Sequence, residues 1–277
     1  MRIANLRGRA VVIVNDGAVD VQTASGGALP ASPDELLRSW HLLSESELDL
    51  SNPEPFDESD LEAPSPHPRQ VFAIGLNFKK HAEESGMGIP SIPATFTKFP
   101  SSLTGPFASV PLAGDSVDWE VELVVILGKD AWKVADENAW EYVAGLTVGQ
   151  DYSDRHVQFA AGSQFSLGKS FYGYGPTGPW LSTLDEFQNP DDLRLGCSLN
   201  GVSVQDDRTS DMIFSVPSLI AELSKVTPLL AGDIIFTGTP SGCGIFQQPP
   251  RFLRDGDVIE SFVEGIGTIR NVVTKES

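Results

Sequence analysis

The sequence predicts an α+β fold that is mainly β: a mixed, largely antiparallel architecture with peripheral helices, preceded by a small N-terminal α+β domain. Three observations predict it. Short apolar segments typical of strands outnumber helical segments beyond residue 66. The chain contains 26 glycines and 20 prolines, which supply turns between such strands. The proline-rich, acidic stretch from Leu50 to Arg69 has the composition of an extended connector.

The predicted N-terminal domain covers residues 1–65. Residues 10–21 form a candidate β-hairpin with Asn15-Asp16-Gly17 as its turn. Ser32-Pro33-Asp34-Glu35 combines an N-cap, a proline at the first helical position and acidic residues in the first turn. Apolar residues then follow at helical spacing as far as Leu43, so we expect one hairpin and one helix here.

The larger predicted domain covers residues 66–277 and is dominated by strands. The candidate strands are Val71–Ile74, Val117–Leu127, Ala144–Val148, Leu193–Leu199, Asp233–Thr237, Val258–Val263 and Thr268–Val273. The candidate helices are Glu137–Val143, Asp154–Ala161 and Ser218–Lys225. This content favours packed β-sheets with helices around them.

Charge and composition exclude several classes of partner. The formal net charge of −19 argues against binding to nucleic acid or to anionic membranes. No apolar run is long enough to span a membrane, and the N-terminus lacks the apolar core of a signal peptide. Two cysteines are too few for a disulfide framework or a cysteine zinc site, so we expect a cytoplasmic protein.

The segment Asp118-Trp119-Glu120-Val121-Glu122 places three carboxylates on one face of a strand, because strand side chains alternate with a period of two. The fully apolar run Leu123–Leu127 follows, as in a strand buried on both faces. Aligned buried carboxylates repel one another unless a cation lies between them. The segment is therefore either a divalent-metal site or an edge strand with one solvated face.

Three other segments have both a functional and a structural interpretation. Asp151 ends a short strand, where it would complete an oxygen-ligand set for a hard cation or cap the helix that follows. His81 and Glu84 are neighbours on a helical turn, as a general base and its orienting carboxylate or as a solvated helix face. The Gly/Pro-rich residues 85–93 after them are either a mobile lid or an ordinary loop.

Five motifs in order resemble the fumarylacetoacetate hydrolase family, from about Val71 to Val273. Each motif is weak alone, but their order and spacing are specific. The matching segments are Gly75–Glu84 (G-x-N-[YF]-x-x-H-x-x-E), Asp118–Leu123 (D-[YW]-E-x-E-L), Thr147–Gln158 (T-x-x-x-D-x-S-x-R-x-x-Q), Gly168–Phe171 (G-K-S-F) and Thr237–Gly244 (T-G-T-P-x-G-x-G).

The resemblance implies a mixed β-roll, usually dimeric, and assigns roles to individual residues. The implied metal ligands are Glu120, Glu122 and Asp151, which would hold Mg²⁺ or Mn²⁺, with Ca²⁺ as a substitute. The implied catalytic residues are His81 and Glu84, as the base pair on a closing lid, and Lys169, as a cation in the site. Arg155 and Gln158 are implied to face the substrate and Thr239 to hold its carboxylate. Asp118 is expected to support the metal ligands without binding the ion.

The chain departs from the family pattern after G-K-S-F, where an aspartate is common and Tyr172 stands instead. Tyr172 and Tyr174 favour a roomier or more aromatic substrate pocket, although the same rings could simply be packed. The metal set is intact, so this departure bears on the identity of the substrate.

The resemblance implies a hydrolase that cleaves a C–C bond in a 2,4-diketo (acylpyruvate-like) acid, a small anionic substrate, in a homodimer. The metal would stabilise the enolate, and the His81/Glu84 pair would activate water. Alternatives in the same family are an oxaloacetate-type decarboxylase and an isomerase or hydratase of a 2-oxo-enoic acid. An alternative of a different class is a binding protein that keeps the fold without turnover, which losses among the ligands or the base pair would have favoured.

Overall fold

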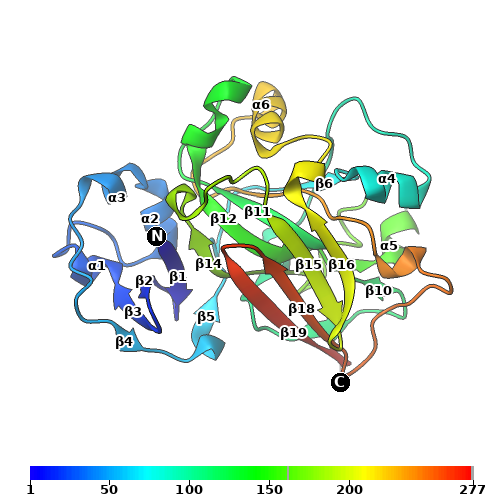
Figure 1. Cartoon of the computed structure of the whole chain (residues 1–277), viewed down its shortest axis with the longest axis horizontal. Helices are drawn as coiled ribbons and strands as arrows, with labels where there is room; N and C mark the ends of the chain where they lie inside the picture. The colour runs from blue at the N-terminus through cyan, green and yellow to red at the C-terminus, as the bar shows by residue number, and fades with distance from the viewer. Residues whose placement is uncertain (161, 276–277) are drawn as a thin grey trace.

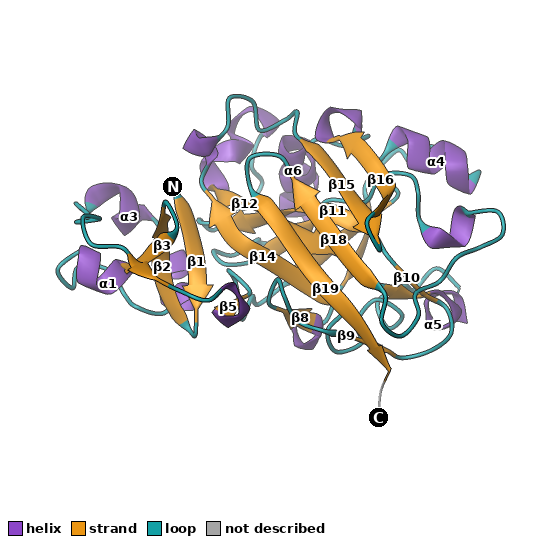
Figure 2. Ribbon diagram, turned by 60° about the horizontal axis from the view of Figure 1, so that its bottom comes forward, coloured by secondary structure: helices purple, strands orange, loops and turns teal. Residues whose placement is uncertain are grey.

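The computed structural model describes residues 1–160 and 162–275. Two large sheets lie face to face, with helices around them (Figures 1 and 2). The predicted fold class, mainly β with mixed sheets and peripheral helices, is confirmed. Among the described residues, none of the helices has the length and apolar character needed to cross a membrane.

The main sheet has twelve strands. In pairing order its path is β4 (Glu54–Pro55), β3 (Gly17–Asp20), β2 (Arg9–Val14), β1 (Arg2–Leu6), β14 (Gly175–Ser182), β12 (Val143–Gln150), β11 (Val121–Leu127), β17 (Ile234–Phe236), β6 (Val71–Gly75) and β7 (Ala94–Thr97). Off this path, β5 (Leu61–Glu62) pairs with β1 and β8 (Leu103–Thr104) pairs with β14. Most neighbours are antiparallel, but β17 and β6 are parallel.

The second sheet has five strands, in the order β16 (Val202–Arg208), β15 (Arg194–Leu199), β18 (Val258–Val263), β19 (Gly267–Lys275) and β9 (Val110–Leu112). A separate pair joins β10 (Val117–Asp118) to β13 (Ser153–Asp154). The α-helices are α1 (Val21–Ala24), α2 (Pro33–Arg38), α3 (His41–Glu45), α4 (Lys79–Ser85), α5 (Arg155–Ala160) and α6 (Val216–Val226). The 3₁₀-helices are η1 (Glu58–Asp60), η2 (Pro100–Ser102), η3 (Asp136–Tyr142), η4 (Leu184–Glu186), η5 (Thr209–Asp211) and η6 (Gly244–Phe246).

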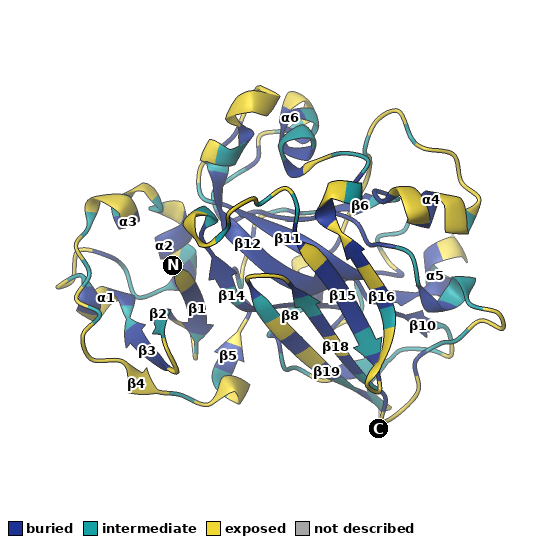
Figure 3. Cartoon of the chain, viewed as in Figure 1, coloured by how far each residue is buried: buried dark blue, intermediate teal, exposed yellow. Residues whose placement is uncertain are grey.

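Strand β11 lies at the centre of the molecule and is buried along its whole length (Figure 3). Leu123 and Val125 belong to the core between the two sheets, whereas Val124 and Ile126 pack on the opposite face against a second apolar cluster. Each such side chain, when fully buried, stabilises the fold by roughly 1.5–3 kcal/mol. Burial on both faces explains why the run after Glu122 has no polar position.

Several predicted elements differ from those observed. The expected strand Val117–Leu127 is two strands, β10 and β11, interrupted at Trp119 and Glu120. The interruption arises because side chains replace ladder partners there: the backbone N–H of Trp119 donates to Asp118 Oδ1, 2.8 Å away, and that of Glu120 to Gln150 Oε1, also 2.8 Å away.

The helices differ mainly at their ends. The single helix expected after Pro33 is divided into α2 and α3, because Ser39 Oγ donates to the carbonyl of Glu35 and ends the first of them. The helix expected over Glu137–Val143 is the 3₁₀-helix η3. The one expected over Asp154–Ala161 corresponds to α5, and its last residue, Ala161, lies outside the described residues.

The first strand joins the N-terminal segment to the rest of the chain. β1 pairs with β14, Arg2 opposite Ser182 and Ile3 opposite Leu181, so β1–β4 extend the main sheet. The hairpin predicted over residues 10–21 corresponds to β2 and β3, with Asn15 at a positive φ of 51°. A domain boundary near residue 66 stays a prediction.

The ends of four neighbouring strands of the main sheet lie side by side, and the row they form is called here one edge of the sheet. β11 begins beside the end of β12, since Val121 is opposite Gln150. β17 runs antiparallel to β11 and β6 runs parallel to β17, so both of these strands end at that same edge. The residues that follow β12, β17 and β6 therefore converge on the residues that begin β11.

Candidate active site and metal centre

Three buried carboxylates meet where these strand ends converge. Glu120 precedes β11, Glu122 is its second residue, and Asp151 follows β12. The backbone N–H of Asp151 donates to the carbonyl of Glu120 at 2.9 Å, which holds the two segments together. One oxygen from each carboxylate lies within 4.8 Å of the others, so the structure brings together all three predicted ligands.

This donor set fits a hard divalent cation. All three groups offer oxygen, which Mg²⁺, Mn²⁺ and Ca²⁺ prefer. Oxygens that share one octahedral Mg²⁺ lie about 3–4 Å apart, close to the spacing of this cluster. The strand architecture therefore assembles a candidate metal site before any ion arrives.

Two buried lysines offset part of the negative charge. Lys169 Nζ contacts Glu120 Oε2 at 2.9 Å and Asp151 Oδ2 at 2.6 Å, and donates to Ser153 Oγ. Lys98 Nζ contacts Asp151 Oδ1 at 2.7 Å and donates to the carbonyl of Lys169. Lys98 follows β7 and is 0% exposed, and sequence reasoning did not single it out. The only indication of its burial in the sequence is that Lys98 lies between two phenylalanines, Phe96 and Phe99.

Arg155, the first residue of α5, links Glu120 to Asp118. Its Nη1 lies 2.6 Å from Glu120 Oε1, and its Nη2 lies 2.6 Å from Asp118 Oδ2. Asp118 also accepts the backbone N–H groups of Gly244 and Ile245. Asp118 therefore contacts a neighbour of the metal ligands and the glycine-rich turn, which is the supporting place expected for it.

The surroundings shift the pKa values of two ligands in opposite directions. Burial raises the pKa of Glu120, but Lys169 and Arg155 outweigh it and lower that pKa to about 2. Burial also raises the pKa of Glu122, and the nearby charges of Asp151 and Glu120 raise it further, well above the usual range. Glu122 accepts a hydrogen bond from the backbone N–H of Gly238 at 2.7 Å.

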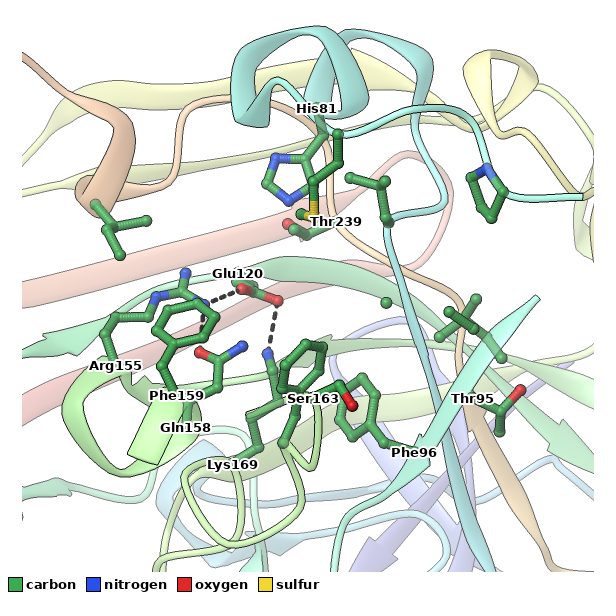
Figure 4. A pocket seen from close by; sticks show the side chains of 18 of the residues that line it. His81, Thr95, Phe96, Glu120, Arg155, Gln158, Phe159, Ser163, Lys169 and Thr239 are labelled. Carbon is green, nitrogen blue, oxygen red and sulfur yellow. Dashed lines mark hydrogen bonds and ion pairs between the residues drawn. The ribbon is translucent and has the colours of Figure 1, made fainter. Parts of the chain in front are cut away.

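A cavity of about 430 Å³ opens above Glu120. Six predicted site residues line it: His81, Glu120, Arg155, Gln158, Lys169 and Thr239 (Figure 4). Met87, Gly88 and Pro90, from the Gly/Pro-rich segment after α4, line it as well. The structure therefore joins the predicted lid segment, the predicted base His81 and one of the three predicted metal ligands, Glu120, in one cavity.

His81 lies across the cavity from Glu120 (Figure 4). It is buried on α4, and its Nδ1 lies 3.2 Å from Glu84 Oε2. Phe246 contacts the imidazole edge-on, with ring centroids 5.5 Å apart. Glu84 also accepts the backbone N–H of Gly242, which ties α4 to the glycine-rich turn. The imidazole is thus oriented on one side by a carboxylate and on the other by a ring.

The glycine-rich turn after β17 approaches the site through its backbone. Gly238 has φ +100°, and a Cβ there would lie 2.6 Å from Asn77 Cβ, so only glycine fits. Thr239 Oγ1 donates to the carbonyl of Val121 at 2.8 Å and accepts from Gln205 Nε2 at 2.9 Å. Its hydroxyl proton is therefore already donated to the backbone carbonyl of Val121. A role of Thr239 in holding a carboxylate stays a prediction.

Of the remaining predicted residues, Gln158 lies in the cavity, whereas Tyr172 is exposed and Tyr174 is packed in the core. Gln158 lines the cavity, and its Oε1 accepts from Arg155 Nη1 at 2.9 Å. Gly168 lets the chain before Lys169 pass against α5, since a Cβ would lie 2.3 Å from Gln158 N. Tyr172 is 72% exposed and is not among the described residues that line the cavity. Tyr174 is buried in the core, so its ring is packed.

Comparisons with known proteins place the chain in a family. The profile described as "Fumarylacetoacetate (FAA) hydrolase C-terminal" matches residues 70–274. The chain belongs to the fumarylacetoacetate hydrolase family. One similar protein is the mitochondrial oxaloacetate tautomerase Fahd2a of Rattus norvegicus, which is 41% identical over 76% of this chain and 68% of that protein.

Solved structures of the fumarylacetoacetate hydrolase fold agree with the architecture described above. One from Mycobacterium smegmatis is 45% identical and superimposes with a TM-score of 0.94 over 100% of both chains. The maleylpyruvate hydrolase of Sphingobium sp. SYK-6, solved with manganese(II) ion and pyruvate, is 27% identical, with a TM-score of 0.78 over 100% of both chains. The resemblance of the five sequence motifs to this family is thus confirmed.

Proposed function

We propose that this chain is a divalent-metal-dependent enzyme whose reaction passes through the enolate of a 2-oxo acid. The reaction we propose is hydrolysis of a C–C bond in a 2,4-dioxo (acylpyruvate-like) acid. The observation that carries the proposal is the His81–Glu84 pair, which faces Glu120 across the cavity. A base on one wall and a candidate metal site on the other suit a substrate held between them.

Glu120, Glu122 and Asp151 would hold Mg²⁺ or Mn²⁺, with Ca²⁺ as a substitute. When bound, the ion polarises carbonyl oxygens and stabilises negative charge on the enolate. The manganese(II) and pyruvate in the maleylpyruvate hydrolase structure support this assignment, since pyruvate is the simplest 2-oxo acid.

The charge of the site supports an anionic substrate. Four carboxylates (Asp118, Glu120, Glu122, Asp151) and three cations (Lys98, Arg155, Lys169) form one connected cluster, and with all seven groups ionised, as in the metal-loaded state, their charges sum to −1. A divalent ion would change that sum to +1. The loaded site would therefore attract a small anion in a protein of net charge −19.

The chain's own residues would carry the proton transfers. His81 takes a proton from water, and Glu84 orients the ring and balances its positive charge. The resulting hydroxide adds to the C4 carbonyl, the C3–C4 bond breaks, and its electron pair remains on C3. The proton then passes from His81 to C3, so that one water converts the 2,4-dioxo acid into a carboxylic acid and pyruvate.

A second candidate is the keto–enol tautomerisation of oxaloacetate, which is favoured by the 41% identity to the rat tautomerase. It requires proton transfer between C3 and the C2 oxygen, without attack by water. Decarboxylation of oxaloacetate and the isomerisation or hydration of a 2-oxo-enoic acid share the same enolate. His81 would serve as the proton carrier in the tautomerase reaction too, so loss of His81 does not separate the candidates, but the products do.

The test measures acetylpyruvate consumption by absorbance and pyruvate release with a coupled dehydrogenase, in the presence of Mn²⁺ or Mg²⁺. We expect one pyruvate per acetylpyruvate and a loss of about 10²–10⁴-fold in kcat for His81→Ala. His67→Ala is the matched control, because His67 also has a carboxylate partner, Asp34 at 2.8 Å, but its side chain is 80% exposed. Full activity of His81→Ala would rule out the proposed base. Rapid loss of enol-oxaloacetate without pyruvate release would assign the chain to the second candidate.

A further inference from the structure

Three phenylalanines form a continuous wall along the cavity, here called the aromatic wall: Phe96, Phe159 and Phe165. Phe96 comes from β7, Phe159 from α5, and Phe165 from the segment after α5. The Phe165 ring contacts both others edge-on, with centroids 5.9 Å from Phe96 and 6.0 Å from Phe159. Edge-to-face packing of this kind fixes the rings relative to one another.

The aromatic wall adjoins the metal end of the cavity. Lys169 Nζ lies 5.3 Å from the centre of the Phe96 ring, so Phe96 adjoins the carboxylate cluster. Phe165 joins Phe96 to Phe159, and Figure 4 shows Phe159 beside Arg155 and Phe96 on the other side of the space below Glu120. Met87 and Pro90 line the same cavity from the segment after α4. A ligand with its head at Glu120 would lay its tail along these rings.

The charges that line the cavity are already engaged at the metal end. Among the described lining residues, Arg155 and Lys169 are the permanently cationic ones, and both pair with carboxylates there. The remaining lining residues near the aromatic wall are neutral, such as Thr95 and Ser163. A second carboxylate on the ligand would lose its hydration without finding a cation.

We infer that the aromatic wall is a subsite for the distal part of the substrate and that it selects 2-oxo acids with an apolar or aromatic tail over dicarboxylic ones. The inference rests on the proposed function, which puts the 2-oxo acid head at the metal. The volume of about 430 Å³ supports it, because cavities of about 300–1,000 Å³ hold drug-sized ligands, larger than a three-carbon acid. Burial of each tail methylene would strengthen binding by up to about 4-fold.

The deciding experiment measures binding by calorimetry to the Mn²⁺-loaded protein, with two 2-oxo acids that lack a cleavable C3–C4 diketone: 4-phenyl-2-oxobutanoate and 2-oxoglutarate. We expect the phenyl acid to bind at least about 10-fold more tightly, which is within the affinity that burial of a ring supplies. Phe165→Arg adds a cation to the aromatic wall and should reverse the preference. Phe165→Leu, which keeps an apolar side chain, should reduce the preference without reversing it and serves if the arginine variant does not fold. Phe56→Leu is the matched control, because Phe56 packs in the N-terminal cluster, outside the cavity.

Turnover of acylpyruvates with tails of increasing length provides the second readout. We expect kcat/KM to rise with each methylene in the parent and to stay flat in Phe165→Arg. Equal binding of the two acids by the parent, or tighter binding of 2-oxoglutarate, would overturn the subsite. Absence of any diketo-acid cleavage together with an intact preference for the phenyl acid would overturn the proposed function and leave the subsite standing.

Discussion

At the scale of single residues, Glu122 is the predicted metal ligand with the fewest compensating contacts. Glu120 has Lys169 and Arg155 at 2.9 and 2.6 Å, and Asp151 has Lys98 and Lys169 at 2.7 and 2.6 Å. Glu122 accepts a hydrogen bond from the neutral backbone N–H of Gly238, whereas the carboxylates of Asp151 and Glu120 lie near it and repel its negative charge. A divalent ion would supply the cation that this side chain needs.

Metal binding should therefore compete with a proton on Glu122. The pKa of Glu122 in the metal-free protein is raised by burial and by Asp151 and Glu120, and a bound ion favours the ionised form. We expect Mn²⁺ affinity to fall as the pH drops below that raised pKa, with release of a proton on binding. Calorimetry in buffers of different ionisation enthalpy measures both effects.

Substitution of the same residue gives the control. Glu122→Gln should abolish Mn²⁺ binding, whereas Glu83→Gln, at an exposed position on α4, should not change it. An affinity that is independent of pH, or a Glu122→Gln variant that binds like the parent, contradicts this account of the site.

Lys98 has a structural role that can be measured without activity. Lys98→Met keeps the apolar stem but removes the charge beside Asp151, and loss of one partner of a buried ion pair costs about 3–5 kcal/mol. We expect a large fall in thermal stability, partly restored by Mn²⁺, because the ion replaces the lost positive charge. Lys79→Met, at an exposed position of α4, should change stability by less than about 0.5 kcal/mol. A Lys98→Met variant as stable as the parent would show that the buried ammonium does not offset the carboxylates.

At the scale of elements, the interrupted strand β10–β11 allows Asp118 and Glu120 to serve different purposes. In a regular strand both carboxylates would point into the same space. The break instead turns Asp118 toward Arg155 and toward the backbone of Gly244 and Ile245, while Glu120 faces the cavity. One short segment thus contributes to the metal site, α5 and η6 together.

Asp118→Asn should therefore weaken the site without destroying it. The amide keeps the shape of the carboxylate but no longer balances Arg155, which remains paired with Glu120. We expect a loss of about 10–100-fold in Mn²⁺ affinity or activity, typical of groups that orient metal ligands. Calorimetry and kinetics on the same preparation, compared with the exposed control Asp115→Asn, measure it. A loss as complete as that of Glu122→Gln would make Asp118 a ligand instead.

Sequence patterns predicted the buried strand after Glu122, the proximity of His81 and Glu84 on a helical turn and the Thr237–Gly244 motif, because these signals are local in sequence. They missed the break at Trp119 and Glu120, because Gln150, which accepts from the backbone N–H of Glu120, is distant in sequence. They missed Lys98 for the same reason, since its burial depends on contacts with Asp151 and Lys169. Tyr172 was assigned by its place after a motif, and neighbours in sequence need not face the same cavity.

At the scale of the whole molecule, exposed apolar residues gather beside the site. Phe99, Leu167 and Tyr172 are 45%, 65% and 72% exposed. Their segments adjoin, because the backbone N–H of Phe99 donates to Ser170 Oγ at 2.9 Å. Clustered apolar side chains of this kind mark interaction surfaces.

We expect a second copy of the chain to cover this surface in the homodimer that the family resemblance implies. Leu167→Lys should shift the equilibrium toward monomer, because it places a charge in an apolar interface, and sedimentation velocity over a range of concentrations measures the shift. Val226→Lys, at a position 83% exposed on α6, is the control. A parent protein that sediments as a monomer at every concentration contradicts the expectation.

The pairing of β1 with β14 has a consequence for the time course of folding in the cell. Arg2 and Ile3 can pair with Ser182 and Leu181 only after the ribosome has added these two residues, long after β1 itself. A ribosome that adds about 5–20 residues per second needs roughly 10–35 s to reach them. Until then β1 has β2 on one side, and on the other side Asn5 and Leu6 pair with β5 while Arg2 and Ile3 have an open edge, which can pair with a wrong neighbour. The Arg2–Ile3 end of β1 therefore completes its pairing long after the rest of this strand.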